Sequence, residues 1–290
     1  MLKAKYSRYL VYTLEFMNVL SVLRHRYVSR SLLLVLTVIL LLLLLLIQPV
    51  QRLQTTIGLV PAAHSQKDSV IIAIWNLHNQ QSWHKSDNNA VISQQFADTS
   101  LGKSDLVALQ EVEQFTEMKA IAGQNAFQFH GSRDAILSKL TVMGSGRVVI
   151  NSKGKDAFWA DVELKNGRLM RLYSVHLSYK KGRSPFIPRI RGDETKALLD
   201  HAEGFTGPVV IAGDFNTLSL LSPDFSKIPV FTHLKNAGFK SSRPLGACNS
   251  QIPLGEQDWI FIKNARSLRF VCGNYAGSDH RWIQAEISFE

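Results

Sequence analysis

Eight polar residues of the chain have side chains suited to metal binding and proton transfer, and most of them stand beside an apolar run. Asn76 follows the run Val70–Trp75, and Glu111 follows Leu106–Leu109 by two positions. The ends of strands are where α/β folds place their sites. Carboxylates and amides bind hard cations, and imidazoles titrate near neutral pH. The eight residues are Asn76, Glu111, His176, Asp214, Asn216, Asp258, Asp279 and His280.

Taken singly, none of these residues is specific, because an Asn after a strand is usually a turn residue and a lone His is usually structural. Their order carries the information. The motifs are WN ending at Asn76, QE ending at Glu111, His176, GDFN at Gly213–Asn216, Asp258, and SDH ending at His280. In this succession they resemble the endonuclease/exonuclease/phosphatase superfamily, also called DNase I-like, over roughly residues 70–287.

The resemblance implies a divalent-metal-dependent phosphoester hydrolase, with Mg²⁺ or Mn²⁺ as cofactor. It implies a four-layer α/β sandwich with two mixed β-sheets flanked by helices. Hydrolysis of a phosphoester requires charge neutralisation on phosphate oxygens and a nucleophile made from water. Glu111 is the first expected metal ligand, Asp279 completes the site directly or through water, and Asn76 supports the metal or the attacking water with its amide.

The remaining motif residues have expected roles in proton transfer and phosphate binding. His280 is the candidate general base, since its ordinary pKa of about 6.5 lies near working pH. Asp258 is expected to orient the imidazole, as in acyl hydrolases. Asp214 positions the water or itself takes the proton, and the sequence leaves that choice open. Asn216 and His176 are expected to donate to phosphate oxygens.

His176 also bears on specificity. The exonuclease III-like abasic-site enzymes of this family usually carry another residue here, whereas a histidine resembles the DNase I, sphingomyelinase and phosphoinositide phosphatase branches. A cationic stretch follows it, and Lys180, Lys181 and Arg183 are the candidate substrate-binding residues. The stretch can track a phosphate backbone, contact an anionic membrane or be a solvated loop.

Short β-branched runs alternate with amphipathic segments from residue 69 onward, and this alternation favours an α/β sandwich with mixed sheets. A turn at Asn166-Gly167 predicts one hairpin. The predicted strands are Val70–Trp75, Leu106–Leu109, Asp134–Ser138, Phe158–Leu164, Arg168–Val175, Pro208–Ala212, Trp259–Ile262, Arg269–Cys272 and Arg281–Ile287. The predicted helices are Asp87–Thr99, Arg191–Glu203 and Phe231–Ala237.

The N-terminal part of the chain predicts a membrane anchor. Residues 32–47 read LLLVLTVILLLLLLLI, and the span 31–50 reaches about 30 Å as a helix, enough to cross a hydrocarbon core. A cleaved signal peptide is the alternative, but no small-x-small cleavage site follows closely. The predicted organisation is a basic lead-in at residues 1–30, a single transmembrane helix at 31–50, a linker at 51–68 and a catalytic domain at 69–290.

The distribution of charge predicts the topology of this anchor. Most of the net charge of +10 lies in residues 1–66, which hold seven Lys and Arg against the single acid Glu15. The high pI is therefore weak evidence that the domain binds nucleic acid. Arg24, Arg26 and Arg30 crowd the N-terminal flank of the apolar segment, so the domain is expected to be extracytoplasmic, in the periplasm if the source is bacterial.

Two cysteines, Cys248 and Cys272, are 24 residues apart and lie outside any zinc-ligand pattern. They pair if the domain faces an oxidising compartment and stay free thiols if it is cytosolic.

Three functions are compatible with the sequence. The first is a metal-dependent phosphodiesterase such as an endonuclease. The second is a lipid or inositol-phosphate phosphodiesterase or phosphatase of the sphingomyelinase kind, which a membrane anchor would suit. The third is an inactive membrane-bound interaction module, which the complete set of motif residues disfavours. The expected partners are the phosphoester substrate and the membrane, and the sequence identifies no protein partner.

Overall fold

The computed structural model describes most of the chain after the predicted anchor. The described residues are 56–58, 69–80, 88–179, 187–217, 228–243, 248–251, 256–275 and 277–289. All of them belong to one compact unit, Gln54–Glu290. The predicted lead-in and the apolar segment 31–50 lie outside the described residues. No helix within the described ranges is both long and apolar enough to cross a membrane.

Seven strands form the first sheet, in the order β1-β12-β13-β2-β3-β5-β4. β2 and β3 are parallel, and the other neighbours are antiparallel, so the sheet is mixed. β1 lies within the predicted linker, and the sheet therefore begins earlier in the chain than residue 69. The strands are β1 Thr56–Gly58, β2 Ser69–Asn76, β3 Leu106–Gln110, β4 Gln128–Gly131, β5 Ala135–Ser138, β12 Ala265–Cys272 and β13 Ile283–Phe289.

Six strands form the second sheet, in the order β10-β11-β9-β8-β7-β6. Here β8 and β9 are the parallel pair, and the remaining pairs are antiparallel. The predicted hairpin is confirmed, because β7 and β8 pair across the Asn166-Gly167 turn. The strands are β6 Val142–Val149, β7 Asp156–Glu163, β8 Leu169–His176, β9 Val209–Asp214, β10 Lys240–Ser241 and β11 Asp258–Lys263.

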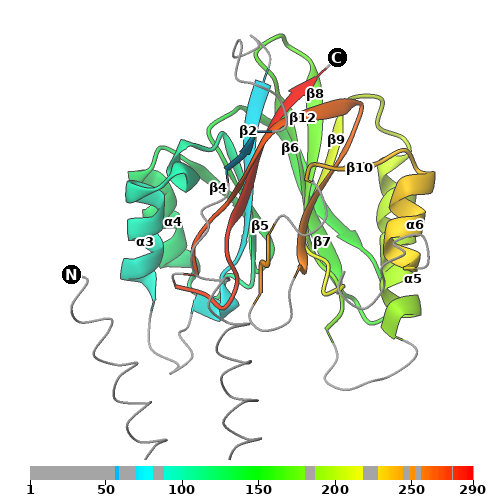
Figure 1. Cartoon of the computed structure of the whole chain (residues 1–290), viewed down its shortest axis with the longest axis horizontal. Coiled ribbons are helices and arrows are strands. Elements are labelled where there is room, and N and C mark those ends of the chain that lie inside the picture. The colour runs from blue at the N-terminus through cyan, green and yellow to red at the C-terminus, as the bar shows by residue number, and fades with distance from the viewer. Residues whose placement is uncertain are drawn as a thin grey trace, which may run out of the picture. The chain divides into compact units, whose positions relative to one another are not determined.

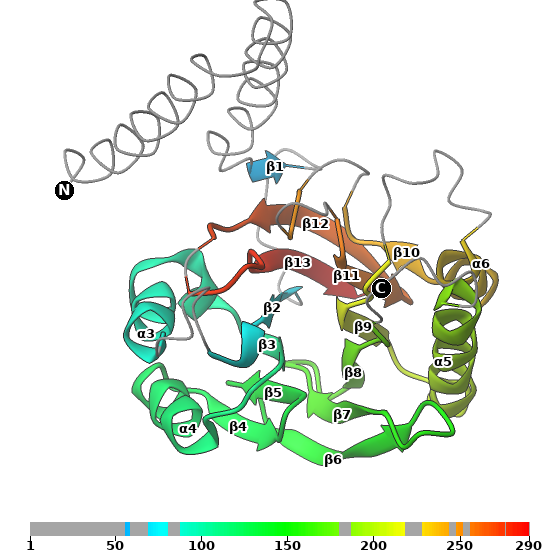
Figure 2. The ribbon, with the colours of Figure 1, turned by 90° about the horizontal axis from the view of Figure 1, so that it is seen from below.

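Four helices of the described residues flank the two sheets, as can be followed in Figures 1 and 2. α3 (Asn89–Asp98) and α4 (Phe115–Gln124) cover the outer face of the first sheet, and α5 (Ile187–Ala202) and α6 (Pro229–Asn236) cover that of the second. The layers follow one another as helix, sheet, sheet and helix, as Figure 1 shows. The prediction of two mixed sheets flanked by helices is confirmed. Two short 3₁₀ turns, η2 (His78–Gln80) and η3 (Ser100–Lys103), complete the described helical elements.

Three apolar clusters hold these layers together. The largest lies between the sheets, and the other two lie beneath each pair of helices. Along β2, Ile72 and Ile74 enter the central cluster, whereas Ala73 and Trp75 enter the cluster under α3 and α4. A strand covered on both faces needs apolar residues throughout. This explains the unbroken apolar run that predicted β2.

Candidate active site

Parallel strand pairs bring the motif residues to one end of the two sheets. In the first sheet Asn76 pairs with Gln110, and in the second His176 pairs with Asp214. The carboxyl ends of parallel neighbours lie at the same edge of a sheet. β11 runs antiparallel to β9, so its first residue, Asp258, is also opposite Asp214. The topology therefore gathers residues that are far apart in the sequence.

Asn76 joins two carboxylates of the site. Its Nδ2 donates to Glu111 Oε1 at 3.3 Å and to Asp214 Oδ2 at 3.0 Å, while its Oδ1 accepts the N–H of His78 at 2.9 Å. Glu111 has a φ of 56°, so the chain turns through the left-handed region as it leaves β3. The sequence-predicted group Asn76, Glu111 and Asp214 is thus in direct contact.

The glycine of the GDFN motif is required by close packing beside the site. Gly213 has a φ of 151°, and a Cβ there would stand 1.9 Å from the carbonyl oxygen of Val175. Only glycine tolerates both conditions. The consequence is that β8 and β9 approach each other closely at their ends, where His176 and Asp214 lie.

Asp258, His280 and Asp214 form a buried series. His280 Nδ1 lies 2.7 Å from Asp258 Oδ2, and its Nε2 lies 3.8 Å from Asp214 Oδ2. All three side chains are buried. A carboxylate on Nδ1 fixes the orientation of an imidazole and leaves Nε2 to face the reacting groups. This is the Asp–His pairing that the sequence predicts.

Burial and neighbouring charges shift the pKa values of this series. Burial by itself lowers the pKa of His280, but Asp258, Asp214 and Asp279 outweigh it and raise the pKa to about 10. Burial raises the pKa of Asp214, and the opposing charge of His280 only partly compensates. A carboxylate with a raised pKa is a better proton acceptor than an ordinary one. With a pKa of about 10 the His280 imidazole carries both protons near neutral pH, so it can donate a proton but not accept one, and Asp214 is the member of the pair that can accept a proton from water.

His176 lies between the two sheets' carboxylates. Its Nε2 is 3.7 Å from Glu111 Oε1 and 3.8 Å from Asp214 Oδ2. Burial lowers the pKa of His176 to about 4, against the attraction of Asp214. The imidazole is therefore neutral at pH 7 and carries one N–H. Its expected contact to a phosphate stays a prediction.

Asn216 contacts the site through its backbone. Its N–H donates to Asp214 Oδ1 at 2.7 Å, and its Nδ2 donates to the carbonyl oxygen of Leu177 at 2.9 Å. A φ of 48° allows the chain to turn back in this way. Asn216 holds Asp214 and ties it to the end of β8, and the second N–H of its amide is available for a ligand.

Asp279 lies at the edge of the group, beside a histidine that the sequence did not single out. His78 Nδ1 is 3.1 Å from Asp279 Oδ1, His280 Nε2 is 3.9 Å from the same oxygen, and Gln251 Nε2 lies 3.4 Å from Asp279 Oδ2. Ser278 Oγ donates to the carbonyl oxygen of Asn76 at 2.6 Å, which joins the SDH motif to the WN motif.

The donor set fits a divalent cation. One ligand atom each from Asp214, Asp258 and His280 lie within 4.8 Å of one another. The predicted ligands Glu111 and Asp279 are more accessible, with side chains 17% and 10% exposed. Several carboxylates gathered in one place, with an amide beside them, suit a hard cation that prefers oxygen ligands.

Three described cations surround this group. After burial, Lys155 and Arg133 are further causes of the lowered pKa of His176, which places their charges near it. Arg191 Nε donates to the carbonyl oxygen of Ser178 at 2.9 Å, two residues after His176. The predicted substrate-binding residues Lys180, Lys181 and Arg183 lie outside the described residues.

Sequence reasoning did not identify His78, Ser250 or Gln251. A histidine two positions after the WN motif is a usable signal for His78, since both residues leave the same strand. Ser250 and Gln251 carry no motif, and they come to the site through contacts with residues 257–258 and 279–280. No local pattern could have indicated them.

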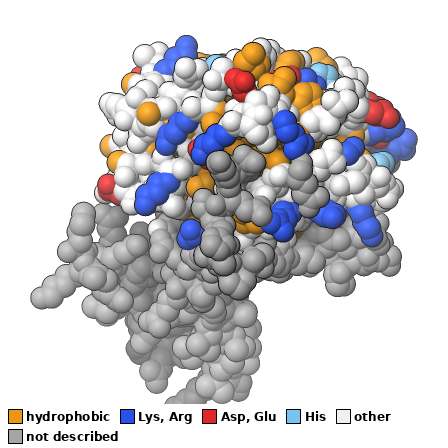
Figure 3. All heavy atoms as spheres, turned by 90° about the horizontal axis from the view of Figure 1, so that it is seen from above, with side chains coloured by type: hydrophobic (Ala, Val, Ile, Leu, Met, Phe, Trp, Pro, Cys, Tyr) orange, Lys and Arg blue, Asp and Glu red, His pale blue; other side chains and the backbone are white. Residues whose placement is uncertain are grey.

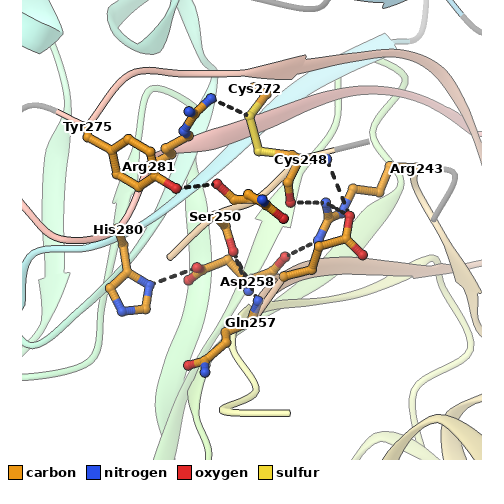
Figure 4. The surroundings of a disulfide bond; sticks show 11 residues. Arg243, Cys248, Ser250, Gln257, Asp258, Cys272, Tyr275, His280 and Arg281 are labelled. Carbon is orange, nitrogen blue, oxygen red and sulfur yellow. Dashed lines mark hydrogen bonds and ion pairs between the residues drawn. A yellow bond between two sulfur atoms is a disulfide. The ribbon is translucent and has the colours of Figure 1, made fainter. Parts of the chain in front are cut away.

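The two cysteines form a disulfide between Cys248 and Cys272, with a Cα–Cα distance of 5.9 Å. Both residues are buried beneath the Asp258 side of the site (Figure 4). The pairing that the sequence left open is therefore made.

Fold and site together define a phosphoesterase architecture, and the comparisons with known proteins agree. The chain belongs to the Endonuclease/Exonuclease/phosphatase family, whose model matches residues 73–280. Members of this family are typically hydrolases of phosphoester bonds and generally depend on a divalent metal. The predicted superfamily is confirmed.

Solved structures share the fold at low sequence identity. The human nocturnin catalytic domain matches with a TM-score of 0.59 and 17% identity, over 81% of this chain and 97% of that one. Mannosyl-6-phosphatase Bt3783 of Bacteroides thetaiotaomicron gives 0.56 and 16%, over 76% and 100%. TDP2 of D. rerio in complex with a single-strand DNA product gives 0.56 and 16%, over 76% and 99%. No curated protein sequence matches the chain.

Proposed function

We propose that this chain is a membrane-anchored, divalent-metal-dependent phosphodiesterase that cleaves nucleic acid. The observation that carries the proposal is the meeting of Asn76, Glu111, Asp214 and His280 at one end of the two sheets, linked by contacts of 3.0 to 3.8 Å. Such a set combines oxygen ligands for a cation with groups that accept a proton from water.

The cation site of the proposal is the more accessible part of this group. Glu111 and Asp279 would hold Mg²⁺ or Mn²⁺, and Asn76 orients Glu111 through its Nδ2. The cation, when bound, neutralises charge on the phosphate oxygens and on the leaving oxygen.

The buried series performs the proton transfer. Asp258 fixes Nδ1 of His280 at 2.7 Å, and His280 Nε2 and Asp214 Oδ2 face each other at 3.8 Å. A water beside this pair would give its proton to Asp214, because His280 with a pKa of about 10 is already protonated near neutral pH, and Asn216 keeps the Asp214 carboxylate in place. In the proposal His176 and the second N–H of the Asn216 amide donate to the phosphate oxygens.

The cations around the pocket favour a polyanionic substrate. Lys155 is held by Asn151 Oδ1 through its backbone N–H at 3.0 Å, and Asn151 is in turn bonded to the buried Glu194 at 2.6 Å. Lys155, Arg191 and Arg133, which also pairs with Glu113 at 3.1 Å, act electrostatically on His176 and Asp214. On the face seen in Figure 3, Lys and Arg side chains are scattered among hydrophobic, uncharged polar and acidic groups.

A phosphate backbone needs cations near the scissile group. Lys180, Lys181 and Arg183, which follow β8, extend this charge in the proposal. The complex of D. rerio TDP2 with a single-strand DNA product shows that the shared fold admits such a substrate in that protein. A substrate of lipid or inositol-phosphate type is the outcome against which the proposal is tested.

The assay uses the full-length chain in detergent. Plasmid, single-stranded DNA, sphingomyelin vesicles and inositol phosphates are each offered with Mg²⁺, with Mn²⁺ and with EDTA, and the His280→Ala variant is the matched control. DNA cleavage that needs metal, is absent in the variant and falls steeply with salt supports the proposal. Metal-dependent turnover confined to vesicles or inositol phosphates overturns the substrate, and no turnover on any phosphoester overturns the activity.

The membrane anchor and the extracytoplasmic location belong to the same proposal. They rest on the apolar segment 31–50 and the basic residues before it. Protease added to spheroplasts is expected to digest the catalytic domain, with a cytoplasmic protein as the internal control. Protection of the domain under conditions that spare the control would reverse the topology.

A further inference from the structure

Four consecutive residues, Cys248–Gln251, lie directly behind the buried series of the site. We call this stretch the brace segment. Figure 4 shows Cys248 and Ser250 of this stretch beside Asp258 and His280. The proposed function assigns no role to any of its residues, yet each of the four makes a long-range contact.

The first half of the brace segment is anchored to the frame of the fold. Cys248 is bonded to Cys272 on β12, and its carbonyl oxygen accepts from Arg243 Nη1 at 2.9 Å. Arg243 is buried, pairs with Glu256 at 2.9 Å and donates to the carbonyl oxygen of Asp258 at 2.8 Å. Tyr275 OH donates to the Asn249 carbonyl oxygen at 2.6 Å.

The second half of the brace segment contacts the catalytic pair. Ser250 Oγ accepts the N–H groups of Gln257 and Asp258, each at 3.0 Å. The Ser250 carbonyl oxygen accepts the N–H of Arg281 at 2.7 Å, the residue after His280. Because Ser250 is fully buried, water cannot replace these bonds without local opening. One residue therefore fixes the backbone at both Asp258 and His280.

Gln251 continues the same contact. It forms an isolated antiparallel bridge with His280, and its side chain reaches Asp279. The brace segment thus touches the backbone or side chain of Asp258, Asp279 and His280 within four residues.

We propose that Ser250 is a positioning residue for the Asp258–His280 pair, and that the Cys248–Cys272 disulfide keeps Ser250 in place so that full turnover requires the bond. The inference rests on the proposed hydrolase function. A displacement of about 1 Å in a catalytic group can cost on the order of 100-fold in rate. The hydroxyl acts through Asp258 and His280 and does not touch the substrate.

The first test compares Ser250→Ala with Ser250→Thr, which keeps a hydroxyl acceptor. Ser267→Ala is the matched control, because its buried hydroxyl makes no hydrogen bond within the described residues. We expect Ser250→Ala to lower kcat by roughly tenfold to 100-fold with KM within about twofold of wild type, and the Thr variant to recover most of the loss. The melting temperature of each variant is measured, and all assays are run well below it.

Two outcomes of this test overturn the positioning role. One is wild-type kcat in folded Ser250→Ala. The other is an equal loss in the Ala and Thr variants that follows their melting temperatures, which marks a purely structural contribution.

The second test removes the disulfide. Both cysteines are buried, which limits the access of a reductant to the sulfurs. The double variant C248A/C272A removes the bond without one. Reduction of the wild type by dithiothreitol is the parallel arm: two electrons and two protons pass to the sulfurs, which become two thiols, and the reagent closes to its cyclic disulfide. Both arms are expected to lower kcat by a factor similar to that of Ser250→Ala.

A double-mutant cycle decides whether the bond acts through Ser250. If it does, adding Ser250→Ala to C248A/C272A causes less than about a threefold further loss, because the same contact is already gone. The coupling is refuted if the kcat loss of the combined variant equals the product of the losses of Ser250→Ala and C248A/C272A. It is also refuted if kcat is undiminished after removal of the bond. Inactivity of the wild type itself on every phosphoester would instead refute the proposed function, so the two failures are distinguishable.

Discussion

The two sides of the active site differ in their access to solvent. On one side the side chains of Asp258 and His280 are 0% and 3% exposed, and on the other those of Glu111 and His78 are 17% and 38% exposed. Buried groups keep fixed positions and shifted pKa values, whereas accessible groups can exchange ligands. We call the side with Asp258 and His280 the sealed side and the side with Glu111 and His78 the open side. The difference in exposure indicates that the sealed side suits proton transfer and that the open side suits the entry of metal and substrate.

The largest expected loss of kcat comes from substitutions on the sealed side. His280→Ala or Asp214→Ala should lower kcat on a phosphodiester by on the order of 1,000-fold, because each variant removes a group that faces the nucleophile. The measurement is steady-state turnover at saturating metal, with circular dichroism to verify folding. His233→Ala on α6 is the control and should retain wild-type turnover. Near-normal kcat in either site variant would refute the assigned roles.

A smaller loss is expected when the sealed side keeps its shape but loses one charge. Asp258→Asn should reduce kcat by on the order of 100-fold, since His280 loses the carboxylate that fixes Nδ1 at 2.7 Å. The magnesium concentration for half-maximal activity should stay near the wild-type value. A shift in that concentration with unchanged kcat would mean that Asp258 serves the metal instead.

The open side should respond in the opposite way. Glu111→Gln is expected to raise the half-saturating magnesium concentration by about tenfold or more, because a carboxylate ligand becomes a neutral amide. A magnesium titration of turnover measures the shift, and manganese provides a second titration. An unchanged midpoint for both ions would remove Glu111 from the metal site.

The mildest effect should come from the most exposed member of the open side. His78→Ala removes the contact to Asp279, and we expect a change in the magnesium midpoint of less than about fivefold, since polar contacts of an exposed side chain contribute little. The same titration detects it. A shift of the magnesium midpoint as large as that of Glu111→Gln would show that the His78–Asp279 pair is part of the metal site. It would thereby sharpen the boundary between the two sides.

The fold was predictable where a pattern is local. β2 reads as an apolar run because both its faces are covered, and α5 shows a clear amphipathic repeat. α4 escaped prediction because only Met118, Ile121 and Ala122 are buried along its ten residues. β6 escaped because glycines interrupt it, and Gly146 leaves room for the Trp159 ring at 3.2 Å from a would-be Cβ.

The candidate site was predictable for a related reason. Its motif residues stand beside apolar runs, and their order along the chain resembles that of the endonuclease/exonuclease/phosphatase superfamily, which implies that they converge. Ser250 and Gln251 were not predictable, since their contacts depend on where a loop lies against residues 257–258 and 279–280. The raised pKa of His280 likewise follows from three carboxylates that meet only in the folded chain.

The position of β13 has a consequence for local unfolding. The strand lies inside the first sheet between β12 and β2, and Ile283 pairs with Ile74. The SDH motif stands just before β13, so a loosening of this strand would displace Asp279 and His280 as well. Opening of the centre of the first sheet and loss of the site are therefore expected to be one cooperative event.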